Sequence, residues 1–140
     1  MTDRLPGDVL GLLRETRALD IETRPAPDVP PHRTTIWVVV DDDGRAFIRT
    51  YRGPGSRWYR EATAAPAVAL LVDGQRIEVA LERADDAERV EACSQALRVK
   101  YADAGGLRGM LASENLPTTL ELQPVPEPTA AEIARYTPSG

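Results

Sequence analysis

Five arginines lie between Gly44 and Arg60, in a segment that contains no acidic residue: Arg45, Arg49, Arg52, Arg57 and Arg60. The chain as a whole has a formal net charge of −5, so this segment is a local cation in an anionic protein. Guanidinium groups form strong, often bidentate hydrogen bonds with phosphates and carboxylates. The segment therefore predicts a site for an anionic ligand; arginines that only solvate the surface are the alternative.

Aromatic residues are interleaved with these arginines, at Phe47, Tyr51, Trp58 and Tyr59. Flat rings beside guanidinium groups suit a ligand that carries both a phosphate and a planar ring. Plain core packing is the alternative interpretation for Trp58 and Tyr59.

Composition narrows the class of protein. A chain of 140 residues with 42% hydrophobic residues fits one compact globular domain. A single cysteine, Cys93, excludes an intrachain disulfide, and one histidine, His32, argues against a zinc or haem ligand set, so we expect no metal. The acidic balance disfavours nucleic acid as a partner. Since we find neither a membrane-spanning apolar run nor a signal-peptide core, we expect a cytoplasmic protein without a membrane partner.

The arginine segment is expected to lie on a strand and at the start of a helix. Thr34 to Val40 is rich in β-branched residues and predicts a strand, Asp41 to Gly44 a turn, and Arg45 to Arg52 a second strand that pairs with the first. On that second strand Phe47, Arg49 and Tyr51 share one face. Ser56 is expected to cap a short helix that ends near Ala64.

The flanking elements complete the predicted fold. We expect a helix over 8–19, a short strand over 21–23, a proline-rich connector over 24–32, a hairpin over 67–82 around Asp73-Gly74, a helix capped by Asp85 and Glu88, and a closing strand over 118–122. These elements predict an α+β fold, a small antiparallel barrel with flanking helices over residues 1–123. A proline-rich C-terminal tail with one short helix is expected over 124–140.

The stretch from Arg33 to Val72 resembles the FMN-binding split-barrel superfamily. Its pyridoxamine phosphate oxidase-like members share, in this order, an arginine before a hydrophobic strand, an aromatic strand that ends in threonine, a serine followed by basic residues, and Asn-Pro before the next strand. The corresponding places here are held by Arg33, the strand from Phe47 to Thr50, Ser56-Arg57 and Ala65-Pro66. The deazaflavin-dependent nitroreductase-like branch is similar at 33–35, 53–55 and Trp58-Tyr59. Within the superfamily the whole chain most resembles an uncharacterised bacterial family of about this length.

This resemblance implies a small split β-barrel that holds FMN or coenzyme F420 between the subunits of a homodimer and acts as an oxidoreductase on an unknown small molecule. The cofactor performs hydride transfer in such proteins, so no residue is assigned a catalytic role. The implied contacts are Arg33, Arg49, Arg57 and Ser56 to the phosphate, Thr50 and Tyr51 near the ribityl chain and ring edge, and Trp58 against the ring or the partner subunit.

The sequence also departs from the family pattern. Nitroreductase-like members carry a Gly-Arg-Lys-Ser-Gly phosphate loop, whereas residues 23–28 keep only Arg24, and their prolines donate no backbone hydrogen bond. Ala65 replaces an asparagine, and Trp58 replaces a second basic residue. A cofactor-free barrel that binds a small anionic metabolite, a scaffold and a cofactor-independent enzyme therefore stay open as alternatives.

Four further residues have expected roles. Cys93 lies on the apolar face of its helix and is expected to be a buried structural thiol. His32 is either a loop residue without a ligand or a hydrogen-bond partner for one. Lys100-Tyr101, at a helix end, is expected at the surface, or alternatively within reach of a neighbouring subunit's pocket.

Overall fold

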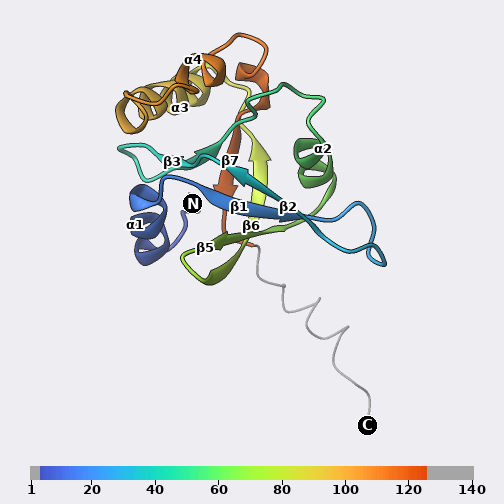
Figure 1. The fold of residues 1–140 in the computed structure, drawn as a ribbon. Helices are drawn as coiled ribbons and strands as arrows, with labels where there is room; N and C mark the ends of the chain where they lie inside the picture. The colour runs from blue at the N-terminus through green and yellow to red at the C-terminus, as the bar shows by residue number, and fades with distance from the viewer. Residues whose placement is uncertain (1–3, 126–140) are drawn as a thin grey trace.

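Seven strands form one curled antiparallel sheet in the order β2-β1-β5-β6-β7-β4-β3 (Figure 1). The computed structural model describes residues 4–125. The elements are α1 (Gly7–Glu15), β1 (Leu19–Thr23), β2 (His32–Ile36), β3 (Val39–Val40), β4 (Ala46–Ile48), α2 (Arg57–Ala64), β5 (Val68–Val72), β6 (Gln75–Arg83), α3 (Ala87–Lys100), α4 (Leu107–Met110), the 3-10 turn Leu116–Thr118 and β7 (Leu120–Gln123). The predicted α+β fold, a small antiparallel barrel with flanking helices, is confirmed.

The strand expected over 34–40 is divided in two. Residues 32–36 form β2 and pair with β1, whereas only Val39 and Val40 form β3 and pair with β4. The following strand is also shorter than expected, because β4 ends at Ile48 and residues 49–52 leave the sheet. The prediction of a hairpin between residues 34–40 and 45–52 is thus wrong except at its tip. The predicted hairpin of β5 and β6 is confirmed, with Asp73 and Gly74 at positive φ.

Two apolar clusters lie on opposite faces of β4. Ala46 and Ile48 belong to the main core, which α1 and α2 cover, and Phe47 packs with Cys93 and Tyr101 of the α3 region. This alternation follows from the period of a strand, in which successive side chains point to opposite faces. In Figure 1, α3 and α4 lie together at the top of the sheet, away from α1 and α2.

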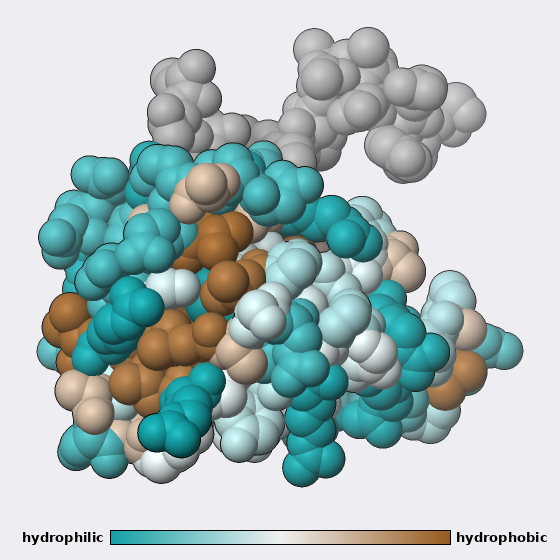
Figure 2. Space-filling model, turned by 90° about the horizontal axis from the view of Figure 1, so that it is seen from above, coloured by the Kyte–Doolittle hydropathy of each residue, from teal (hydrophilic) through white to brown (hydrophobic). Residues whose placement is uncertain are grey.

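Apolar surface is limited in extent. Figure 2 shows hydrophobic residues gathered in one area of the face seen from above, with hydrophilic residues over most of the remainder. Among residues 4–125 the large apolar side chains that stay exposed are Tyr51, Val99 and Val125. No helix in this part of the chain is both long and apolar enough to cross a bilayer.

The start of α3 differs from the prediction in detail. Its N-cap is Asp86, whose carboxylate accepts a hydrogen bond from the Arg89 amide, rather than Asp85. Glu88, expected to complete the cap, instead forms an ion pair with Arg45 at 2.7 Å. The short helix predicted within the C-terminal tail lies outside the described residues.

The Cys93 thiol is buried, as predicted, and is 1% exposed. Burial raises its pKa to about 12, and only the thiolate is nucleophilic. We expect a thiol-specific disulfide reagent at pH 8 to react with the folded protein about 100-fold more slowly than with the unfolded chain. Equal rates in the two states would contradict this burial.

The same shift makes stability depend on pH. The unfolded thiol ionises near pH 9 whereas the folded one stays protonated to about 12, so its contribution to stability is present below pH 9 and is lost as pH rises above it. Urea denaturation at pH 8 and 10 measures this loss, which we expect to be smaller in Cys93→Ala.

Candidate functional site

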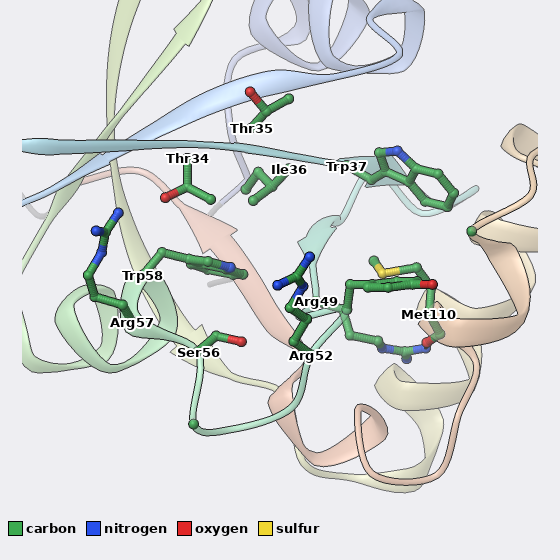
Figure 3. A pocket seen from close by; sticks show the side chains of 13 residues that line it. Thr34, Thr35, Ile36, Trp37, Arg49, Arg52, Ser56, Arg57, Trp58 and Met110 are labelled. Carbon is green, nitrogen blue, oxygen red and sulfur yellow. The ribbon is translucent and has the colours of Figure 1, made fainter.

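The segment that leads from β4 to α2 borders a cavity of about 820 Å³. The opposite wall is made by β2 and the residue after it, and one end is closed by α4 and the turn before it (Figure 3). Trp37 and Met110 lie toward one end in this view, Arg57 and Trp58 toward the other. The lining residues are Thr34, Thr35, Ile36, Trp37, Arg49, Tyr51, Arg52, Gly55, Ser56, Arg57, Trp58, Gly106 and Met110.

The wall of this cavity is positively charged. Arg49, Arg52 and Arg57 line it, and within residues 4–125 no aspartate or glutamate does. Arg52 and Arg57 are exposed, and neither has an ion-pair partner in the described part of the chain. Guanidinium groups without an ion pair attract an anion, so these arginines give the cavity wall a positive charge.

Arg49 lines the cavity, but its guanidinium is hydrogen-bonded within the protein interior, and the residue is 1% exposed. Its guanidinium donates hydrogen bonds to Thr119 Oγ1 at 2.9 Å, Ser94 Oγ at 3.0 Å, the Met110 carbonyl at 3.1 Å and the Val90 carbonyl at 3.0 Å. All four partners are neutral, and burial lowers the pKa of Arg49. Arg49 therefore joins α3, α4 and the residue before β7, and it has little hydrogen-bonding capacity left for a ligand.

Thr50 does not line the cavity. It is buried, and its hydroxyl donates to Asn115 Oδ1 at 3.0 Å and lies 2.9 Å from Thr118 Oγ1. Asn115 Nδ2 in turn donates to the Tyr51 carbonyl at 2.9 Å and the Gly109 carbonyl at 2.7 Å. The expected contact of Thr50 with a ribityl chain has no support in this geometry; Thr50 instead helps to fix the backbone that carries Tyr51 and Arg52.

Arg33 lies away from the cavity. It faces Glu22 across the β1–β2 pair, and its Nε lies 3.3 Å from Glu22 Oε1. Arg76 also binds this carboxylate at 2.7 Å, and its hydrogen bond is the main reason that the pKa of Glu22 is lowered. The prediction that Arg33, Arg49 and Arg57 converge on one phosphate is therefore wrong for Arg33.

Ser56 and the first turn of α2 form the other end of the wall. The Ser56 hydroxyl donates to the Gly53 carbonyl at 2.8 Å and makes no capping hydrogen bond, although Ser56 holds the N-cap position. The first backbone N–H groups of a helix lack intrahelical partners and carry partial positive charge. Arg57 and Trp58 belong to this turn, so the arginine charge and the helix terminus act at the same place.

Among the lining residues that the sequence does not assign to the site, Arg52 adds a charge and Trp37 adds an aromatic ring. Arg52 belongs to the basic segment, and the Gly53-Pro54-Gly55 sequence that follows it signals the end of a strand and a turn of the chain. Trp37 is stacked on Tyr101, with ring centroids 3.9 Å apart and planes 3° apart. No sequence signal links these two rings, because they are 64 positions apart.

The Lys100-Tyr101 pair contacts other parts of the same chain, which corrects the expected surface or intersubunit position. The Tyr101 hydroxyl donates to the Arg17 carbonyl at 2.6 Å. Lys100 Nζ donates to the carbonyls of Leu13 at 2.8 Å and Val38 at 2.7 Å, and desolvation lowers the pKa of Lys100 to about 8. These contacts hold the segment that carries Trp37.

His32 is in β2 rather than in a loop, and its Nδ1 lies 3.0 Å from both carboxylate oxygens of Glu61 in α2. The Thr23 hydroxyl donates to Glu61 as well, at 2.8 Å. His32 does not line the cavity; it links the strand and the helix that form two of its walls.

Comparison with known sequences places the chain in a family. The sequence profile of DUF2255, described as uncharacterized protein conserved in bacteria, matches residues 10–122. No sequence match to a curated protein was found.

Several solved structures share the fold. A conserved hypothetical protein from Mycobacterium tuberculosis has a TM-score of 0.57 at 16% identity over 91% of this chain and 85% of that one. A putative pyridoxamine 5′-phosphate oxidase from Listeria innocua has a TM-score of 0.55 at 16% identity over 86% and 92%. A putative 5-nitroimidazole antibiotic resistance protein from Bacteroides thetaiotaomicron has a TM-score of 0.58 at 8% identity over 87% and 81%. At these identities the likeness shows the split-barrel fold alone.

Proposed function

The chain belongs to the DUF2255 family of uncharacterized bacterial proteins, and on that premise we propose that it binds a flavin-type cofactor, FMN or coenzyme F420, and acts as an oxidoreductase on a small molecule. The observation that carries this proposal is the cavity lined by Arg49, Arg52 and Arg57 with no acidic residue from the described chain. Likeness in fold to a putative pyridoxamine 5′-phosphate oxidase supports it.

The residues fit such a group. A cavity of about 820 Å³ is within the range of small-molecule sites, and it combines cationic side chains with aromatic ones. Arg52, Arg57 and the first amides of α2 would hold the phosphate, and the buried Arg49 would add positive charge to the cavity wall. Trp37, Tyr51 and Trp58 are the rings available to contact a planar group.

The protein's contribution is binding, orientation and exclusion of water. The bound cofactor supplies the hydride-transfer chemistry, so the site needs no general acid or base. We include a homodimer in the proposal because Tyr51, at the cavity edge, is 55% exposed, and a second copy would cover such a ring. Light scattering during size-exclusion chromatography measures the mass of the protein in solution, which a homodimer makes twice that of one chain.

A second candidate is a cofactor-free protein that binds a small anionic metabolite. It is favoured by the engagement of Arg33 with Glu22 and of Arg49 with internal acceptors, which leaves Arg52 and Arg57 as the main anion contacts. Two exposed guanidinium groups are enough to bind a small phosphate or carboxylate ligand that carries no planar ring.

Thermal unfolding with added ligand distinguishes the two. We expect FMN or coenzyme F420 at about 100 times its dissociation constant to stabilise the protein by about 2.7 kcal/mol, and the freshly purified protein to absorb between the near ultraviolet and blue. A colourless protein whose melting temperature neither cofactor raises would remove the first candidate. Stabilisation by inorganic phosphate or a dicarboxylate alone would favour the second.

A further inference from the structure

The ring of Tyr51 lies directly against the backbone of α4. A Cβ atom built on Gly109 would lie within 3.0 Å of three ring carbons of Tyr51, closer than real side chains approach. The Tyr51 ring also comes within 3.7 Å of a Cβ built on Gly106. This position of the ring therefore requires glycine at 109, while Gly105, just before α4, has open space around it.

The backbone on both sides of this contact is fixed. Asn115, which is buried, donates through Nδ2 to the carbonyls of both Tyr51 and Gly109. The Tyr51 side chain, by contrast, is 55% exposed, so its other side has no packing that would hold it in place. A methyl group at 109 would thus displace the ring and not the main chain, and the ring borders the cavity.

We propose that Gly109 sets the size of the ligand that the cavity admits, by letting the Tyr51 ring lie close against α4 and so leaving room for a planar ring beside Trp37. The identity of that ligand rests on the proposed function. The position of the Tyr51 ring against α4 rests only on the contact between Tyr51 and Gly109.

Four variants test this inference: Gly109→Ala, the control Gly105→Ala, Tyr51→Ala, and the double variant of Tyr51→Ala with Gly109→Ala. We expect Gly109→Ala to weaken FMN or coenzyme F420 binding about tenfold, and Gly105→Ala to leave it within about twofold. Alanine favours a helix more than glycine does, so the melting temperature of Gly109→Ala should not fall.

The double variant decides whether Gly109 acts through the ring. If it does, adding Gly109→Ala to Tyr51→Ala changes affinity by less than about twofold, since the clashing ring is gone. A tenfold loss that persists without the ring would overturn the inference.

A measurement without cofactor separates this inference from the proposed function. The indole N–H resonance of Trp37, assigned with Trp58→Phe, should shift in Gly109→Ala because the neighbouring Tyr51 ring has moved, and should stay in place in Gly105→Ala. An unchanged Trp37 resonance in Gly109→Ala would refute the displacement of the ring. If the Trp37 resonance shifts but no cofactor binds the wild-type protein, the proposed function and the role of Gly109 in ligand size would be refuted. The position of the Tyr51 ring against Gly109 would still be supported.

Discussion

Replacing Arg52 and Arg57 together with alanine is expected to lower the affinity for FMN or coenzyme F420 about 100-fold. Both side chains line the cavity, and neither has an acidic partner in the described residues that would compete with a ligand. A hydrogen bond to a charged group contributes about 1.5–3 kcal/mol, and about 1.4 kcal/mol corresponds to tenfold in affinity. Fluorescence titration with each cofactor measures the loss.

Arg60→Ala is the matched control for this pair. Arg60 belongs to the same basic segment and is exposed, but it does not line the cavity. We expect it to change affinity less than about threefold through long-range charge, an effect that added salt removes. A double variant that binds as well as Arg60→Ala does would exclude Arg52 and Arg57 as the anion contacts.

Replacing Arg49 with methionine is expected to destabilise the fold by about 3 kcal/mol. The change leaves two hydroxyls and two carbonyls in the interior without their donor, and buried polar groups without partners are costly. Arg49 thus differs from Arg52 and Arg57, whose loss should affect binding and not stability. Urea denaturation measures the free energy of unfolding.

Arg98→Met is the control, because Arg98 is half exposed on α3 and its partner Glu91, at 3.6 Å, is exposed as well. Surface pairs of this kind contribute about 0–1 kcal/mol. If Arg49→Met were as stable as Arg98→Met, the internal role of Arg49 would be refuted, and a direct role in ligand binding would take its place.

Local sequence patterns predicted the fold class and the basic segment that borders the cavity. The alternation in the β4 segment put Arg49 on the same face as Phe47, and both indeed point away from the main core. The turn residues Asp73-Gly74 and the Gly53-Pro54-Gly55 break located the second hairpin and the start of α2. These signals are local, so a single sequence contains them.

Partners distant in the sequence account for what was missed. The family resemblance implies that Arg33 contacts the phosphate, but the pairing of β2 with β1, which has no local sequence signal, brings Glu22 opposite Arg33. Thr50 and Arg49 are bound by residues 41–70 positions away. Arg52 lines the cavity because β4 ends at Ile48, so the strand alternation predicted over 45–52 does not hold at Arg52.

The most direct test of the cationic cavity is a crystal structure of the protein grown with FMN, and a second with coenzyme F420. We predict density for a phosphate within hydrogen-bond distance of the Arg52 or Arg57 guanidinium, and for a planar ring between these arginines and Trp37. Cofactor density elsewhere on the protein, with this cavity holding only water, would contradict the account.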